Sequence, residues 1–323
     1  LSSPTPAPTS SPTPTATSTI TPSPSPSPTA TETPTLTPTP IPLGASPERS
    51  RRIVIISIDG LRPDALQMAS APNILALAQR GAYTFEAQTI FPSVTLPAHA
   101  AMLSGYPPEA HGLTWNDYRP AEGHIRVPTI FSIAQEAGWR TAMVVGKEKF
   151  AHLALPDSVD AYVFARQGDQ DVANQAITQA QAGFDVMFVH FPNTDYFGHL
   201  FGWMSERYIA EISNTDEAVG RLLAAFPEDT TVILSSDHGG HGLTHGANIP
   251  EDMTIPWIIA GPGVLADHAL TTPVNTMDTA ATALYTFSLS LSPGAEGKVV
   301  YEAYGQVEPG TLPNAPASLS PDT

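Results

Sequence analysis

One glycine-rich segment, 235–246, brings together one carboxylate and three imidazoles, which are side chains that could bind a metal ion. It contains Asp237, His238, His241 and His245 and follows the apolar run 231–234. Carboxylate oxygen and imidazole nitrogen are ligands that zinc accepts, and glycine lets the backbone turn sharply beside a bound group. Histidines can also gather by chance in a polar loop. The rest of the chain must therefore distinguish a metal site from such a loop.

Polar side chains follow four apolar, strand-like runs at their carboxyl ends. They are Asp59 after 53–58, Lys147 and Lys149 after 141–145, Asp195 and His199 after 184–191, and Asp237 and His238 after 231–234. Continuous apolar runs are typical of buried parallel strands. Ligands of open α/β proteins bind at the carboxyl ends of such strands. We therefore expect four segments that are far apart in the sequence to converge on one site.

The number of candidate ligands is sufficient for two ions. Asp195 and His199 are four residues apart, so on a helix they would share one face and could bind one ion. The other candidates are Asp59, Asp237, His238 and His245. Six ligands suit a pair of ions, each with three protein ligands and an open position. Each residue also has a purely structural alternative, such as a helix cap for Asp59 or a core imidazole for His199.

The alternation of strand-like and helix-like segments predicts an α/β fold. Further helices are expected at 71–80, 130–137, 171–182, 206–226 and 275–285, and a further strand at 255–260. The segment 91–105 is expected to be a turn followed by a short alanine-rich helix. This order predicts a mostly parallel central sheet with helices on both faces.

The first 43 residues differ sharply in composition from the rest. They are nearly all Ser, Thr, Pro and Ala, with Glu32 as the only charge. Such a segment buries too little apolar surface to offset its ordering entropy. We expect a disordered spacer at 1–45, a catalytic domain at 46–305 and a disordered tail at 306–323. The alternative for the spacer is a low-complexity tail with no role beyond solubility.

The first residue, Leu1, is not methionine, so we expect that a targeting peptide was removed or omitted. With the spacer, this predicts an exported, extracellular or cell-surface protein, with a membrane or cell-wall tether upstream of Leu1. The sequence leaves the oligomeric state open.

The charge of the chain limits its partners. The formal net charge is −17, which argues against a nucleic-acid-binding surface. An anionic substrate would need a local positive centre, which metal ions or a few lysines could supply. The chain has no cysteine, so thiolate metal sites and disulfides are excluded.

Five motifs together resemble the alkaline phosphatase superfamily. They are Ser57-Ile58-Asp59-Gly60, Phe91-Pro92-Ser93-Val94-Thr95-Leu96-Pro97, His111-Gly112-Leu113-Thr114-Trp115-Asn116, Asn193-Thr194-Asp195-Tyr196-Phe197-Gly198-His199 and Ser236-Asp237-His238-Gly239. Within the superfamily they are similar to the type I phosphodiesterase/nucleotide pyrophosphatase family, in order over about 46–265. The resemblance implies a three-layer alkaline-phosphatase-like fold and hydrolysis of phosphodiester or nucleotide pyrophosphate bonds.

The resemblance also implies two zinc ions. One would be held by Asp195, His199 and His245 and would activate water; the other would be held by Asp59, Asp237 and His238 and would activate Thr95. Thr95 would attack phosphorus and form a covalent phospho-threonine, and Asn116 would donate to a non-bridging oxygen. The alternative for Thr95 is a helix N-cap, and Mn²⁺ could replace Zn²⁺ at such ligands.

Three histidines remain outside this scheme. His99 is interpreted as a packed residue or one that supports a ligand, His111 as a residue that orders its turn, and His241 as the competitor of His245. His245 is preferred because the segment after it leads into 251–256 as the last ligand of the family does.

The two lysines, Lys147 and Lys149, leave the substrate open. They resemble the lysine-containing strand end of phosphomonoesterases and phosphonate hydrolases of the superfamily, where they would bind a dianion. A diester instead needs an apolar slot, for which Tyr118, Phe150 and Tyr196 are candidates. The lysines could also be a solvated pair at the rim. A remote alternative is a non-catalytic surface-binding module.

Overall fold

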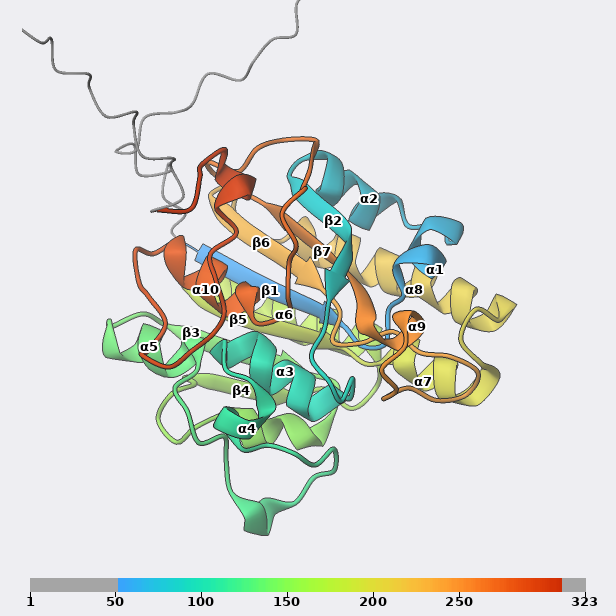
Figure 1. Cartoon of the computed structure of the whole chain (residues 1–323), viewed down its shortest axis with the longest axis horizontal. Coiled ribbons are helices and arrows are strands. Elements are labelled where there is room, and N and C mark those ends of the chain that lie inside the picture. The colour runs from blue at the N-terminus through green and yellow to red at the C-terminus, as the bar shows by residue number, and fades with distance from the viewer. Residues whose placement is uncertain (1–51, 310–323) are drawn as a thin grey trace, which may run out of the picture. The chain divides into compact units, whose positions relative to one another are not determined.

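The computed structural model describes residues 52–309, whose strands form one eight-stranded sheet (Figure 1). The spacer predicted for 1–45 lies outside the described residues, as does the predicted tail beyond residue 309. The division of the chain into spacer, domain and tail therefore stays a prediction. Within 52–309, no helix is long and apolar enough to cross a membrane.

The sheet is mostly parallel, as predicted. Its strands are β1 (Arg52–Ile58), β2 (Ala82–Gln88), β3 (Thr141–Val145), β4 (Ala161–Phe164), β5 (Val186–Phe191), β6 (Thr230–Ser235), β7 (Thr254–Ala260) and β8 (His268–Ala269). They lie in the order β4-β3-β5-β1-β6-β7-β2-β8. The first five in this order are parallel to one another, whereas β7 is antiparallel to both of its neighbours.

Helices cover both faces of the sheet (Figure 1). One face packs against α3 (Thr95–Ser104), α5 (Ile130–Glu136) and α10 (Asp278–Tyr285). The other packs against α1 (Pro63–Met68), α2 (Pro72–Gln79), α6 (Asp169–Ala182) and α8 (Glu206–Leu223). The remaining helical segments are α4 (Pro108–His111), α7 (Asn193–Phe201), α9 (Pro250–Met253) and the 3₁₀ turns Pro120–Glu122, Glu148–Leu153 and Tyr301–Tyr304.

The two-sided burial explains the apolar runs in the sequence. On β1, Ile53 and Ile55 belong to one core cluster, and Val54 and Ile56 belong to the cluster on the opposite face. Because successive strand residues point to opposite faces, a strand covered on both sides needs an apolar residue at every position. This confirms the three-layer α/β fold.

The strand order brings the predicted polar segments together. β3, β5, β1 and β6 are consecutive neighbours in the sheet, and all four are parallel. Their carboxyl ends lead into Lys147, α7, Asp59 and Asp237 respectively. Four segments separated by up to 178 positions in the chain therefore meet at one edge, as expected.

Candidate active site

Two carboxylates that follow neighbouring strands share one ammonium group. Lys147 Nζ lies 2.7 Å from Asp59 Oδ2 and 2.6 Å from Asp195 Oδ2. His190 Nε2, on β5, lies 2.7 Å from the same Asp59 oxygen. One oxygen of each carboxylate is therefore engaged. The other, Oδ1 in both residues, is buried and has no hydrogen-bond partner in the described part of the chain.

The third carboxylate, Asp237, is arranged in the same way. The Gly60 N–H donates to its Oδ1 over 3.1 Å, and its Oδ2 is buried and has no hydrogen-bond partner among the described residues. Thr95 Oγ1 and His238 Nε2 are also buried and unpartnered there. His238 Nε2 lies 3.3 Å from Asp237 Oδ2 and 3.5 Å from Asp59 Oδ1. Bare polar atoms are costly in a protein interior, and a bound cation would satisfy this group of atoms.

The three imidazoles predicted as ligands are oriented alike. The partners of Nδ1 are the carbonyl oxygens of Leu243 for His199 (2.9 Å), Gly239 for His238 (2.7 Å) and Ser93 for His245 (2.9 Å). A carbonyl only accepts, so Nδ1 carries the proton and Nε2 presents a lone pair to the site. Burial, above all, lowers the pKa of His245 to about 4 and lowers the pKa of His238, so both rings are neutral near pH 7.

The ligand atoms form two groups of three that share His238. The groups are Asp59, Asp237 and His238, and Asp195, His238 and His245, with all ligand atoms of each group within 4.8 Å of one another. The first is the set predicted for the nucleophile's ion. The second contains His238 where the prediction has His199. His199 lies at the outer edge, because its side chain is 44% exposed, but its Nε2 is 3.4 Å from Asp195 Oδ1.

His241 points away from this cluster. Its Nδ1 lies 2.7 Å from Asp252 Oδ1, and it belongs to neither group of candidate ligands. The preceding Gly240 has no room for a side chain, because an added Cβ would lie 2.2 Å from the Trp203 ring. Glycine at this position lets the loop from His238 to His245 pack against Trp203, and His241 binds Asp252 and not the candidate ligands.

Thr95 stands at the first position of α3 with its hydroxyl inside the site. Val94 is the N-cap residue of that helix, and no side-chain cap is formed, so the N-cap alternative for Thr95 does not hold. Asn116 Oδ1 accepts from the Leu96 N–H and from Lys149 Nζ, both over 2.9 Å. Because its oxygen is engaged twice, the amide nitrogen of Asn116 is the atom left to donate to a ligand.

The two lysines have different partners. Burial alone would lower the pKa of Lys147, but Asp59 and Asp195 raise it above the ordinary value. Lys149 contacts Asn116, and burial foremost, with the nearby charge of Lys147, lowers its pKa to about 8. The interpretation as a solvated pair at the rim is wrong for Lys147, because its ammonium bridges two buried carboxylates.

Sequence reasoning missed several residues that support the site. His190 binds Asp59, and its only signal was a single polar residue inside an apolar strand. Trp203 Nε1 and the Tyr208 hydroxyl both donate to the Gly60 carbonyl, over 3.0 and 2.8 Å. Neither aromatic residue belongs to a motif with chemistry of its own.

His99 and His111 are both fully buried, which agrees with the interpretation of His99 as a packed residue. His99 Nδ1 lies 2.8 Å from the Thr95 carbonyl and its Nε2 lies 2.7 Å from Ser57 Oγ. Burial lowers its pKa well below the ordinary value. His111 Nδ1 accepts from the Leu113 N–H within its own turn.

The predicted aromatic slot is only partly available. Phe150 is fully buried and its ring packs 4.2 Å from that of His190, so its proposed place in a substrate slot is wrong. Tyr196 and Tyr118 are 59% and 44% exposed, so both are accessible to a ligand.

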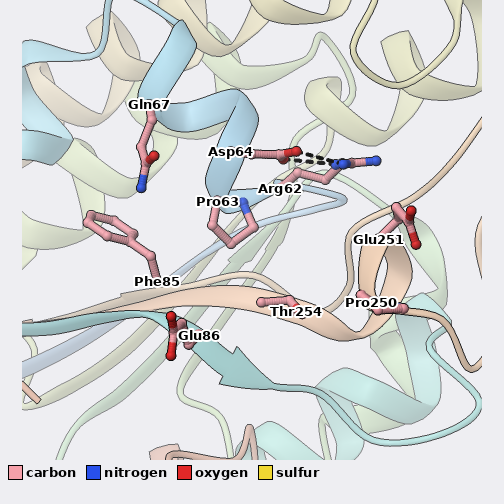
Figure 2. A pocket seen from close by; sticks show the side chains of 9 residues that line it. All are labelled: Arg62, Pro63, Asp64, Gln67, Phe85, Glu86, Pro250, Glu251 and Thr254. Atoms are coloured by element: carbon pink, nitrogen blue, oxygen red, sulfur yellow. Dashed lines mark hydrogen bonds and ion pairs between the residues drawn. The ribbon is translucent and has the colours of Figure 1, made fainter. Parts of the chain in front are cut away.

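A pocket of about 370 Å³ lies beside the site but is not part of it (Figure 2). Its lining residues are Arg62, Pro63, Asp64, Gln67, Phe85, Glu86, Pro250, Glu251 and Thr254. Three carboxylates and one guanidinium, itself paired with Asp64, make it unsuited to a phosphoryl group. Its lining residues contact the histidine loop at Gly240, whose carbonyl accepts from Arg62 Nη1 and whose N–H donates to the Glu251 carbonyl.

Comparison with known proteins agrees with this geometry. The sequence profile of the family "Type I phosphodiesterase / nucleotide pyrophosphatase" matches residues 53–252, which include every predicted site residue. The chain belongs to this family. It is a family of hydrolases of phosphodiester and pyrophosphate bonds, so the family predicted from the motifs is confirmed.

The relatives of this chain within the family have low sequence identity to it. An uncharacterized pyrophosphatase/phosphodiesterase of Schizosaccharomyces pombe is 26% identical over 214 residues, 58% of this chain and 44% of that protein. A bis(5'-adenosyl)-triphosphatase of Xenopus laevis is 24% identical over 221 residues, 61% of this chain and 49% of that protein. The chain thus spans about half the length of these curated relatives or less.

The fold of the phosphodiesterase family is also found by structural comparison. An inactive variant of murine ectonucleotide pyrophosphatase/phosphodiesterase 5, solved in complex with AMP, has a TM-score of 0.68 with this chain. The match covers 79% of this chain and 99% of that one, at 14% identity. At this identity the likeness shows the shared fold.

Proposed function

We propose that this protein is a two-zinc phosphohydrolase that cleaves phosphodiester or nucleotide pyrophosphate bonds through a covalent phospho-threonine. The observation that carries the proposal is the group of five buried, unpartnered atoms. They are Asp59 Oδ1, Thr95 Oγ1, Asp195 Oδ1, Asp237 Oδ2 and His238 Nε2. Four are ligand atoms of the kind zinc binds, and the fifth is a hydroxyl that could act as a nucleophile.

The chain's own residues can position a phosphoryl group. In the proposed reaction Thr95 Oγ1 loses its proton to solvent and forms a bond to phosphorus as the bond to the leaving alkoxide or phosphate breaks on the opposite side. Water then cleaves the bond between Thr95 Oγ1 and phosphorus, which releases the phosphate product and restores the hydroxyl. The Asn116 amide nitrogen donates to a non-bridging oxygen. At the start of α3, the Leu96 N–H is used by Asn116 and Pro97 has none, so the Thr95 N–H is the further backbone donor.

The ligand set fits divalent ions with nitrogen and oxygen donors. We assign Asp59, Asp237 and His238 to the ion beside Thr95, and Asp195, His199 and His245 to the other. When bound, the two ions would lower the pKa values of the threonine hydroxyl and of a water molecule. Asp and His ligands also suit Mn²⁺, so zinc is part of the proposal.

We favour a diester or pyrophosphate over a phosphate monoester as substrate. The monoesterase alternative needs Lys147 and Lys149 for the extra negative charge. Lys147 is held by Asp59 and Asp195, and Lys149 by Asn116. The exposed ring of Tyr196, next to Asp195, is available for a leaving group. The names of the relatives, a phosphodiesterase and a bis(5'-adenosyl)-triphosphatase, point the same way.

An extracellular place of action, with a tether beyond the spacer, belongs to the same proposal. Relatives named ectonucleotide pyrophosphatase/phosphodiesterase support it. A small phosphate ester is the expected partner, because Thr95 and Asn116 suit a phosphoryl group and the formal net charge of −17 argues against a nucleic-acid-binding surface.

The test compares wild type with Thr95→Ala and His241→Ala. Each protein is assayed for zinc content and for hydrolysis of bis-p-nitrophenyl phosphate and p-nitrophenyl phosphate. We expect wild type to bind two zinc ions and prefer the diester. Thr95→Ala should keep zinc and lose turnover by about 10³-fold or more, and His241→Ala should keep both. Normal activity of Thr95→Ala would exclude the phospho-threonine, and a metal-free, inactive wild type would exclude the enzyme.

A further inference from the structure

Lys147 was expected to bind a substrate dianion, but its ammonium contacts two carboxylates of the protein. It comes from the segment after β3, and its two partners come from the segments after β1 and β5. Those carboxylates, Asp59 and Asp195, belong to different groups of candidate ligands. One ammonium thus connects three neighbouring strands and both halves of the site.

We propose that Lys147 is a positioning residue that couples the two ligand sets. It holds Oδ2 of Asp59 and of Asp195, which directs Oδ1 of each toward the shared site, and it does not serve primarily to bind substrate. This inference depends on the metal-binding part of the proposed function and is independent of which ester is cleaved.

The charge balance of the site supports this role. Three carboxylates, Asp59, Asp195 and Asp237, are all less than 5% exposed and lie within reach of one imidazole, that of His238. Repulsion between buried like charges is large unless a cation lies between them. Lys147 is the one lysine or arginine of the described residues that forms an ion pair with any of the three.

The neighbouring lysine provides a matched control. Lys149 is two residues away, is also largely buried, and carries the same charge. Its ammonium, however, contacts the Asn116 carbonyl and amide oxygens, and it forms no ion pair with the ligand carboxylates in the described part of the chain. A general effect of removing positive charge from this edge would appear in both lysine variants. An effect of coupling the carboxylates would appear only at Lys147.

The experiment measures thermal unfolding of the full chain in chelator and in saturating zinc. In chelator, Lys147→Met should melt roughly 5–10 °C below wild type, because two buried carboxylates lose their common cation. Saturating zinc should remove most of this difference, since the ions supply the missing positive charge. Lys149→Met should differ from wild type by about 3 °C or less in both conditions.

A double variant keeps the test decisive if Lys147→Met is too unstable to measure. Asp59→Asn/Lys147→Met removes one of the two repelling charges together with the cation. It should be more stable in chelator than Lys147→Met alone, which is a positive coupling between the two positions. A double variant no more stable than the single one overturns the proposal.

A different outcome is expected if Lys147 serves to bind substrate. In that case Lys147→Met would melt like wild type in chelator, and only its KM for p-nitrophenyl phosphate would rise, which overturns the coupling role. Zinc content and turnover of wild type report separately on the proposed function. If wild type binds zinc but Lys147→Met melts at the wild-type temperature in chelator, this inference is refuted and the proposed function is not.

Discussion

Two buried groups of acidic side chains contact or contribute to α7, and they differ in one respect. In the first, Asp59, Asp195 and Asp237 each have one oxygen engaged and one bare. In the second, Asp169 and Glu211 have a donor on all four oxygens. The donors are the Asn193 N–H (3.0 Å), Thr215 Oγ1 (2.5 Å), Asn193 Nδ2 (2.7 Å) and Asn214 Nδ2 (2.9 Å).

Burial alone therefore does not distinguish the two groups. Asp169 is 2% exposed, which is comparable with Asp195 at 4%. A fully hydrogen-bonded buried carboxylate serves the fold, here by binding the start of the helix that carries Asp195 and His199. A half-satisfied carboxylate costs stability unless a ligand completes it. The number of bare oxygens is thus the observation that separates a binding site from a structural network.

The largest expected effect is at His238, which both ligand groups share. His238→Ala should lose the zinc ion beside Thr95 and reduce kcat/KM by about 10³-fold or more. Zinc content after dialysis and diester hydrolysis measure the two effects. His241→Ala removes an imidazole from the same loop and should change neither. Unaltered zinc content in His238→Ala would contradict its assignment as a zinc ligand.

Asn116→Ala tests whether the Asn116 amide, which lies at the site of the first group, donates to the substrate in the transition state. Removal of one transition-state donor should lower kcat by roughly 10²–10³-fold while zinc content stays that of wild type. Steady-state kinetics on bis-p-nitrophenyl phosphate measures the change. If only KM rises, Asn116 binds ground state and transition state equally, and its assigned role is wrong.

Asp169→Asn tests the second group through pH. Burial, above all, raises the pKa of Asp169 to about 7, whereas an aspartate in the unfolded chain titrates near 3.9. Between these values the folded state retains a proton that the unfolded state has lost. Stability contributed by Asp169 is therefore present at low pH and is lost as the pH rises toward 7.

The isosteric amide cannot ionise and should remove this dependence. Relative to wild type, the free energy of unfolding of Asp169→Asn should increase by roughly 2 kcal/mol between pH 5 and pH 7.5. Urea unfolding at both pH values in the same buffer measures it. Parallel pH profiles for the two proteins would show that Asp169 does not titrate in this range.

The smallest effect is expected at Tyr196, whose exposed ring lies next to Asp195 but outside both acidic groups. Tyr196→Ala should raise KM for an aryl diester roughly 2–10-fold, through lost ring contact, and leave kcat and zinc content unchanged. Tyr162→Ala, a partly exposed tyrosine on β4, is the control. Equal effects of both variants would mean that Tyr196 has no special contact with the substrate.

The sequence was sufficient to predict five of the eight strands and most candidate ligands, because apolar runs and polar strand ends are local patterns. The strand at 141–145 and the start of α8 at Glu206 agree with the structure, the latter because Ser205 caps the helix by accepting from the Tyr208 N–H. β2 and β4 were missed, since both contain exposed positions that interrupt the pattern.

The supporting contacts could not be predicted, because they depend on tertiary packing. Nothing in the spacing of Lys147 indicates that its ammonium lies between two carboxylates 88 and 48 positions away. Likewise, His190 was hidden inside a strand, and Phe150 was a candidate for the substrate slot, although it packs against His99 and His190.

The Gly60 peptide has a consequence for attempts to rebuild this site elsewhere. Its N–H holds Asp237, its carbonyl accepts from Trp203 and Tyr208, and its positive φ of 70° leaves an added Cβ 3.0 Å from the Asp195 Cα. One residue thus links the loops after β1, β5 and β6. The site is consequently not modular: a graft of the histidine loop alone onto another sheet would lack the peptide that orients its aspartate, and protein engineers would have to transplant all three loops together.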